Sequence, residues 1–136
     1  EQSDGTSWMA MYCLNLWEIS LVLARRDAVF EDMATKFFEH FAYIAAAMYS
    51  QGLWNDEDGF YYDVLSLESG ETIPLRVRSL VGLLPLCATS TLDAETEHAL
   101  PHFAYYMEWF LANKAYLADH VAHDHGTGGR PGRLFS

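Results

Sequence analysis

Residues 8–24 read WMAMYCLNLWEISLVLA, and this stretch decides the fold. The only polar side chains within it are Asn15, Glu18 and Ser20. A helix that is apolar on nearly all sides is buried on nearly all sides. The arginine pair at 25–26 follows it, where positive charge suits the carboxyl end of the helix dipole. We therefore predict a long interior helix near the start of the chain.

The rest of the chain alternates between amphipathic and apolar segments. We predict an amphipathic helix at 28–50, followed by a β-hairpin that pairs 60–65 with 72–75. An apolar interior helix then covers 79–89, where Pro85 kinks or shortens it. A short helical piece at 93–97, a helix from Pro101 to about 115 and a loop from His120 onward complete the chain. Alternating inner and outer helices suit a helical toroid, whose inner ring lines a cavity, although a plain bundle also fits. We predict an all-α fold with a small β-hairpin insertion.

Composition excludes several classes of protein. The 136 residues carry 19 acidic and 8 basic side chains, a formal net charge of −11, which argues against a phosphate-binding track for nucleic acid. With 51 % hydrophobic residues, the chain has enough apolar surface to fold. The longest strongly apolar stretches, 44–48 and 80–88, fall short of the roughly 18 residues that span a membrane. The acidic start is unlike a signal peptide, so we expect a cytoplasmic protein.

Both ends of the sequence resemble cuts through a longer protein. The chain does not begin with Met, and an apolar run begins at its last residues, 134–136. The aromatic content of 15 % is also high for so short a chain. We expect a fragment of a larger domain that exposes apolar surface which the rest of the protein would cover.

Several residues are candidates for chemistry, and each has an alternative structural role. Asp4 is either the N-cap of the first helix or a catalytic carboxyl at the mouth of an inner helix, with Trp8 as a sugar platform. Trp54 and its neighbours Tyr61, Tyr62 and Asp63 combine flat rings with polar groups, as carbohydrate sites do, or else pack the hairpin onto the helices, the role we favour for Tyr61.

Two further pairs of residues carry predictions. Arg76 and Arg78 share one face if extended, and either bind a substrate carboxylate or, as we favour, form an ion pair within the protein. Cys13 and Cys87 both fall in apolar helical patterns, which favours small buried packing residues over a disulfide or a metal pair.

We predict no metal site and no cofactor. The acidic turn at 55–59 does not fit a calcium-binding EF-hand loop, because Trp54 and Leu65 would occupy ligand positions. His120, His123 and His125 lie beside a glycine-rich loop without a helical pattern, which favours incidental histidines over a zinc site.

Three segments together resemble bacterial glucosidase-like proteins of glycoside hydrolase family 63, which belong to the six-hairpin glycosidases that also include trehalases. The segments are EQSDGTSWM at 1–9, GLWNDEDGFYYD at 52–63 and VRSLVGLLPL at 77–86. The resemblance implies a partial (α/α)6 toroid of about two helical hairpins, with residues 1–118 as a fragment of the catalytic barrel and 119–136 as a tail that leads to the missing part.

The resemblance also implies a function. It implies an inverting hydrolase of α-glucosidic bonds with two catalytic carboxyl groups, of which Asp4 would be the general acid. The base is a glutamate without a counterpart in this chain, so the fragment would be inactive alone. The partners would be a carbohydrate substrate and the rest of the same barrel. The residues that bind the substrate would be Trp8, Trp54, Tyr62, Asp63 and Arg78.

Two alternatives remain open. One is a sugar epimerase on the same toroid, which would more typically use histidines in the cavity. The other is a non-catalytic helical interaction module, which predicts that Trp8 and Trp54 lie on an exposed patch rather than around a concave pocket.

Overall fold

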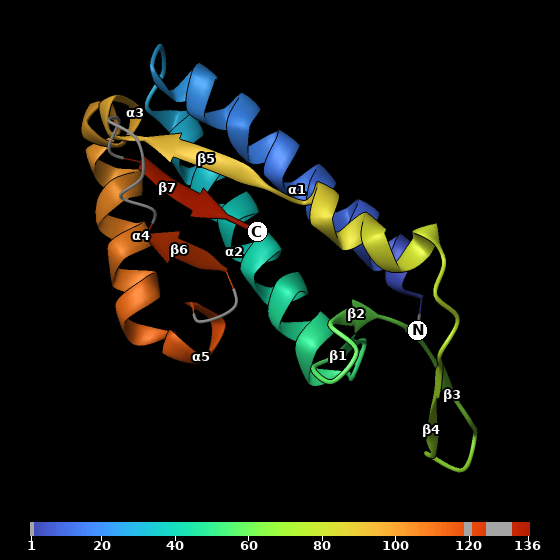
Figure 1. Cartoon of the computed structure of the whole chain (residues 1–136). Coiled ribbons are helices and arrows are strands. Elements are labelled where there is room, and N and C mark those ends of the chain that lie inside the picture. Colours follow the sequence, from blue (N-terminus) through green and yellow to red (C-terminus); the bar gives the residue numbers. More distant parts are fainter. Residues whose placement is uncertain (1, 119–120, 125–131) are drawn as a thin grey trace.

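The structure, a computed structural model, describes residues 2–118, 121–124 and 132–136. It begins with a helical hairpin in which α1 (Ser3–Ala24) packs along α2 (Val29–Ser50) over most of their lengths (Figure 1). Both helices were predicted, and α2 begins within one residue of its expected start. Most of the described residues are helical, so the prediction of a mainly helical fold with a small β-hairpin is confirmed.

A second helical unit crosses one end of this hairpin. It consists of α3 (Ala94–Ala99), α4 (Pro101–Asn113) and the short α5 (Ala115–Ala118). Pro101 occupies the first turn of α4, where its missing N–H costs nothing. The buried carboxylate of Glu31 on α2 accepts a hydrogen bond from the Phe103 N–H at 2.9 Å and so satisfies a free donor at the start of α4.

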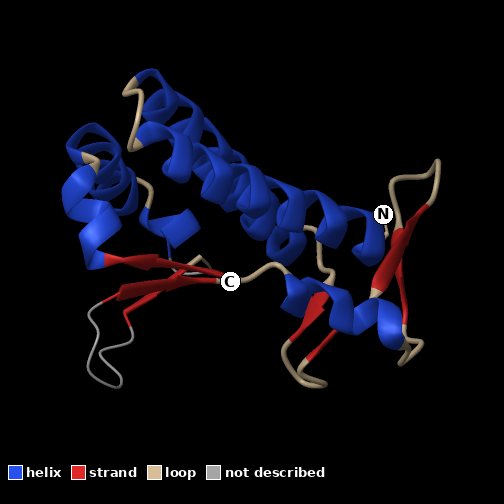
Figure 2. Ribbon diagram, turned by 90° about the horizontal axis from the view of Figure 1, so that it is seen from above, coloured by secondary structure: helices blue, strands red, loops and turns tan. Residues whose placement is uncertain are grey.

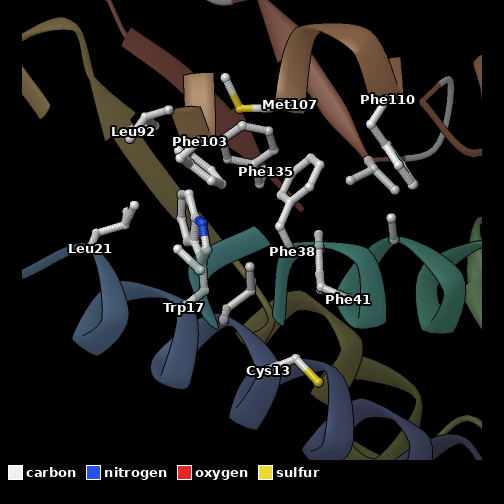
Figure 3. Close-up of a cluster of buried hydrophobic side chains, with 14 of the residues drawn as sticks. Cys13, Trp17, Leu21, Phe38, Phe41, Leu92, Phe103, Met107, Phe110 and Phe135 are labelled. Atoms are coloured by element: carbon white, nitrogen blue, oxygen red, sulfur yellow. The ribbon is translucent and has the colours of Figure 1, made fainter. Parts of the chain in front are cut away.

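An aromatic core joins the two units (Figure 3). Trp17 of α1 and Phe38 of α2 are fully buried, and both contact Phe103 of α4, with ring centroids about 6 Å apart. Phe135 lies between them at 5.4 and 5.3 Å, edge-on to both rings. Edge-to-face contacts of this kind add to the hydrophobic gain from burial. The core therefore draws on residues from both ends of the sequence.

Two small antiparallel hairpins follow α2. In the first, β1 (Trp54–Asn55) pairs with β2 (Phe60–Tyr61) around the acidic turn, which ends at Gly59 with a positive φ of 58°. In the second, β3 (Asp63–Ser66) pairs with β4 (Thr72–Leu75). The second hairpin confirms the predicted pairing with 72–75 for residues 63–65. Residues 60–61 were assigned to the wrong partner, because they pair with β1.

A three-stranded sheet forms at the end of the helical hairpin that lies away from the two small β-hairpins (Figure 2). In it, β7 (Gly132–Phe135) lies between β5 (Ser90–Asp93) and β6 (Ala122–Asp124), and both pairings are antiparallel. The prediction of loop from His120 onward was wrong for β6 and β7. Local sequence favoured a loop, but the pairing with β5 and the burial of Phe135 decide the structure.

The predicted interior helix at 79–89 was also wrong in type and in burial. This segment forms a 3-10 helix, η1 (Leu80–Cys87), in which only Gly82 is buried. Leu80 is 73 % exposed and Leu86 66 % exposed. Pro85 explains the geometry, because it lacks the N–H that a longer α-helix would need there. Cys87 is exposed, contrary to prediction, whereas Cys13 is buried as predicted, and burial raises the pKa of its thiol.

The prediction that α1 is buried on nearly all sides was correct for only one face. The other face exposes an apolar stripe, here called the α1 outer stripe, made of Trp8, Met9, Tyr12, Leu16, Ile19, Val22 and Leu23. Of the described helices, α1 alone is long and apolar enough to cross a membrane. The expectation that every apolar stretch is too short to span a membrane was therefore wrong for α1. However, 44 % of its most apolar window is buried in the fold, and core helices of soluble proteins share this composition.

Candidate functional site

The three segments at 1–9, 52–63 and 77–86 meet at the amino-terminal end of α1. The first contact joins residues 60 positions apart: the Ser3 N–H donates to Oδ1 of Asp63 at 2.7 Å. The cap residue of α1, Gln2, makes no side-chain cap bond, so the carboxylate of Asp63 performs that role from β3. The start of α1 and the end of the GLWNDEDGFYYD segment are thereby tied together.

Asp4 lies in the first turn of α1 and not at its cap. Its Oδ1 accepts the N–H of the next residue, Gly5, at 2.7 Å, and the side chain is half-buried. The N-cap interpretation of Asp4 was therefore wrong, because the helix starts at Ser3, before Asp4. A carboxylate in the first turn still interacts favourably with the helix dipole.

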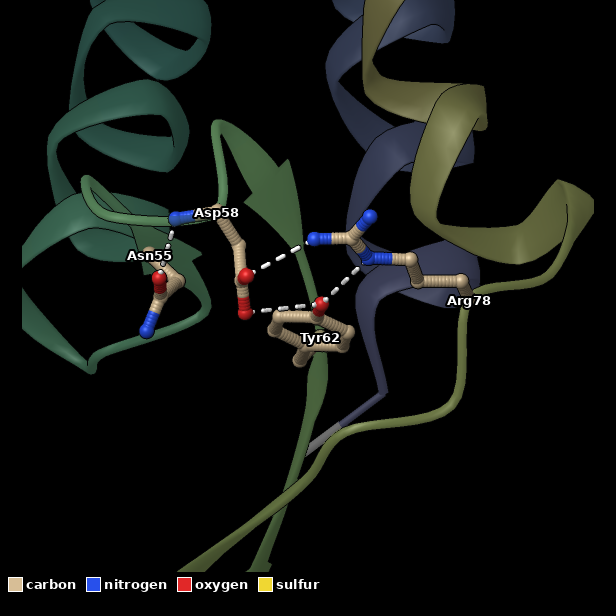
Figure 4. Close-up of polar contacts among 4 residues, drawn as sticks. All are labelled: Asn55, Asp58, Tyr62 and Arg78. Carbon is tan, nitrogen blue, oxygen red and sulfur yellow. Dashed lines mark hydrogen bonds and ion pairs between the residues drawn. The ribbon is translucent and has the colours of Figure 1, made fainter.

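The second contact joins Asp58, Tyr62 and Arg78 (Figure 4). Arg78 Nη2 lies 2.7 Å from Asp58 Oδ1, and Arg78 Nε donates to the Tyr62 hydroxyl at 3.2 Å. The same hydroxyl donates to Asp58 Oδ2 at 3.0 Å. The hydrogen bond from Tyr62, and then Arg78, hold the pKa of Asp58 below its usual value. The preferred interpretation of Arg78 as part of an internal ion pair is confirmed.

The ring of Tyr62 is only 3 % exposed, and this limits what it can bind. Its flat face is covered, and its hydroxyl already has two partners. Tyr62 therefore anchors β3 in the fold. The guanidinium of Arg78 is different, because its side chain is 64 % exposed and retains donors for a ligand.

The third contact is a close approach between η1 and β2. A Cβ at Gly82 would lie 2.2 Å from a ring carbon of Phe60 and 2.3 Å from the Tyr61 carbonyl oxygen. Only glycine allows the two backbones to come so near. This contact fixes the VRSLVGLLPL segment against the GLWNDEDGFYYD segment.

A pocket of about 290 Å³ opens between α1, the end of α2, the first hairpin and η1. Trp54 and Tyr61 form one wall, with ring centroids 4.8 Å apart. Asp56 holds two lining rings, accepting the indole N–H of Trp54 at 2.8 Å and the hydroxyl of Tyr49 at 3.4 Å. No Asp or Glu side chain lines the pocket within the described part of the chain, so it offers stacking surface rather than acid–base side chains.

Trp8 is not part of this pocket. Ala10 lines the pocket from α1, and because each helical residue turns by about 100°, Trp8 points about 160° away from it. Trp8 is 44 % exposed and lies beside Tyr12 on the α1 outer stripe. Trp8 and Trp54 thus face different surfaces, and the two rings do not form one platform.

Other candidate residues fall outside the site or outside the described chain. Glu1, His120 and His125 lie outside the described residues, and so do the imidazole contacts of His123. Among the residues that the structure does describe, no group of three or more His, Cys, Asp or Glu side chains is placed to hold a metal ion.

Sequence reasoning missed the structural roles of several residues in the site. Asp56 and Asp58 read as a solvated acidic turn, although one holds two aromatic rings and the other holds Arg78. A signal for Gly82 was present, since a glycine in the middle of a leucine-rich helical segment indicates a close backbone approach.

Comparisons with known proteins place the chain within a longer relative. No protein-family model and no solved structure match it. The chain is 38 % identical over 135 residues to a protein of Saccharomyces cerevisiae that bears the name "Uncharacterized protein YMR196W". The match covers 88 % of this chain but 12 % of the yeast protein. The chain therefore spans a small part of the length of the relative that it resembles.

Proposed function

We propose that this chain is part of the catalytic barrel of an inverting glycoside hydrolase that cleaves α-glucosidic bonds. The observation that carries the proposal is the meeting of three distant segments at the start of α1. Ser3 bonds to Asp63, Arg78 bonds to Asp58 and Tyr62, and Gly82 contacts Phe60 and Tyr61. These are the same segments whose sequences resemble glycoside hydrolase family 63.

In this proposal Asp4 is the general acid that protonates the glycosidic oxygen. A general base elsewhere in the barrel activates a water molecule on the opposite face of the sugar, about 6.5–9.5 Å from the acid. Arg78 supports substrate hydroxyl groups with its exposed guanidinium.

The α1 outer stripe supports the proposal that this chain is part of a larger barrel. An apolar helix face of this length is costly to leave in water, and single-domain proteins seldom expose such a patch. In a partial (α/α)6 toroid, α1 is an inner helix, and neighbouring hairpins of the same polypeptide cover the stripe. The yeast relative is long enough to supply them, since the matched region is 12 % of its length.

The Trp54 pocket supports a sugar ligand. Sugars present C–H faces that stack on aromatic rings, and the Trp54–Tyr61 wall offers such a surface. Asp56 fixes the wall by its bonds to Trp54 and Tyr49, so little ordering is needed on binding. The pocket serves as a sugar subsite beside the catalytic end of α1.

The test compares Asp4→Asn with wild type in the full-length protein. Hydrolysis is measured on 4-nitrophenyl α-glucoside and on α-linked glucose disaccharides. Loss of a general acid lowers kcat by about 10²–10⁴-fold on the disaccharides, whose leaving groups need protonation. Asp32→Asn is the matched control, because Asp32 is an exposed carboxylate in the first turn of α2.

Each outcome decides one part of the proposal. Full activity in Asp4→Asn would remove Asp4 from the mechanism while leaving a glycosidase. Proton NMR of the first product must show inversion at the anomeric carbon, and retention would exclude the inverting mechanism. An inactive wild-type protein on every α-glucoside would reject the hydrolase assignment.

A further inference from the structure

We infer that Asp63 is a positioning residue that holds the first turn of α1, and with it Asp4, in a fixed place. The inference rests on the proposed function for its catalytic consequence, but the structural part stands on the Ser3–Asp63 contact alone. The sequence suggested that Asp63 contacts a sugar. Its carboxylate instead accepts a hydrogen bond from the backbone N–H of Ser3 in α1.

The need for an external acceptor follows from helix geometry. The first four N–H groups of an α-helix have no partner within the helix. In α1 the residue at the cap position, Gln2, leaves them without a side-chain acceptor of its own. A carboxylate is a strong acceptor there, because the bond is charge-assisted and the helix dipole favours negative charge.

The remote origin of this acceptor distinguishes α1 from two other helices of the chain. Asp27 accepts the Val29 N–H at the start of α2, and Asp93 accepts the Thr96 N–H at the start of α3. Both act within three residues, so they stabilise their helices without fixing them to anything else. Asp63 acts across 60 residues and so fixes the end of α1 to β3.

The backbone on both sides of Asp63 is itself held in place. On one side, buried Tyr62 is bonded to Asp58 and Arg78. On the other side, β3 pairs with β4, with Asp63 opposite Leu75. Side chains alternate along a strand, so with Tyr62 and Val64 directed into the fold, Asp63 is directed to the other side, toward α1.

The catalytic consequence comes from the sequence order. Asp4 follows Ser3 directly, so any shift in the first turn of α1 also moves the Asp4 carboxyl. A misplacement of about 1 Å at a reacting group can cost about 100-fold in rate. The Asp63 carboxylate thus controls the efficiency of the acid without touching the substrate.

The experiment compares Asp63→Ala and Asp63→Asn in the full-length protein. Hydrogen–deuterium exchange is followed in the peptide that spans residues 2–10, and kcat and KM are measured on an α-linked disaccharide. Asp27→Ala is the matched control, since it removes a carboxylate cap of the same kind from α2. Asparagine retains an oxygen that can accept the Ser3 N–H, whereas alanine does not.

The expected result is a paired change in structure and in rate. In Asp63→Ala, exchange in residues 2–10 rises about 10-fold and kcat falls about 10–100-fold, while KM changes less than threefold. In Asp63→Asn, exchange in residues 2–10 and kcat both stay close to their wild-type values. Asp27→Ala changes neither the exchange in residues 2–10 nor kcat. A rise in KM with unchanged kcat would overturn the inference and return Asp63 to direct substrate binding.

Two further outcomes separate the inference from the proposed function. Unchanged hydrogen–deuterium exchange of residues 2–10 in Asp63→Ala would show that Asp63 does not hold the start of α1, whatever the activity of the variant. Raised exchange with unchanged kcat would overturn the positioning role. If the wild-type protein hydrolyses no α-glucoside, the hydrolase proposal fails, and the exchange comparison still decides whether Asp63 holds the start of α1.

Discussion

At the scale of single residues, Gly82 makes a sharp prediction. Gly82→Ala places a methyl group 2.3 Å from the Tyr61 carbonyl oxygen, so η1 must move away from β2. We expect a loss of about 1–3 kcal/mol in the free energy of unfolding, measured by urea denaturation of the full-length protein. Gly5→Ala is the control, because a Cβ there meets nothing within 4 Å and alanine favours the helix.

Asp58 predicts a dependence of stability on pH. Tyr62 and Arg78 lower the pKa of Asp58 in the folded protein. Its contribution to stability is therefore complete above the unfolded pKa and is lost as the pH falls through the lower, folded value. Urea denaturation should show that wild type has a larger free energy of unfolding than Asp58→Asn at pH 7, and that this difference disappears toward pH 3. A difference that widens on acidification would contradict this assignment.

The sequence predicted the kind of contact a residue makes better than it predicted the partner. An ion pair for Arg78 was favoured because buried charges are usually paired, but its partner Asp58 was read as part of a solvated turn. The bond between Ser3 and Asp63 could not be predicted in this way, because no local pattern relates residues 60 positions apart. For Trp54 the sequence fitted a sugar site and a structural role equally well, whereas it favoured the structural role for Tyr61.

At the scale of elements, the α1 outer stripe provides a test of the barrel. Ile19 is 55 % exposed in this chain. If neighbouring hairpins cover it, Ile19→Glu buries a charge and lowers the free energy of unfolding of the full-length protein by several kcal/mol. Lys36→Glu on the exposed side of α2 serves as control and should change it by less than about 0.5 kcal/mol. Equal, small effects of both would mean that the stripe faces water.

The strand β7 makes a second prediction at this scale. Phe135 is fully buried against Trp17 and Phe38. Phe135→Ala should therefore cost about 3–5 kcal/mol, from lost burial and the cavity that remains. Tyr105→Ala provides the contrast, since Tyr105 is 74 % exposed on α4. Denaturant titration of both variants checks the difference, and a mild effect of Phe135→Ala would show that β7 is dispensable.

At the scale of the whole molecule, sequence pattern predicted the helices well and their environment less well. Periodic apolar residues predicted α2 and the buried side of α4, because an amphipathic pattern specifies which face is covered. The apolar segments α1 and η1 carry no such contrast between faces. Their exposed sides depend on what packs against them, and composition alone led to a prediction of full burial.

The sheet shows the same limit for long-range pairing. The residues of β7 have a glycine-rich, loop-like context, and β5 lies about 40 positions earlier in the chain. Burial of Phe135 in the core brings the two strands together. The position of an aromatic residue in the tertiary structure thus overrode local preference, as is common for short strands.

The carboxylate that caps α1 also sets an order of events during synthesis. The chain is made from its amino end, so α1 is complete long before Asp63 exists. At roughly 5–20 residues per second, the 60 residues between Ser3 and Asp63 correspond to about 3–12 s. During that interval the Ser3 N–H can donate its hydrogen bond only to water. The first turn of the helix therefore frays. The start of α4 has no such delay, because Glu31 is made 72 residues before Phe103. The segment that holds Asp4 is thus synthesised well before the residue that fixes it in place.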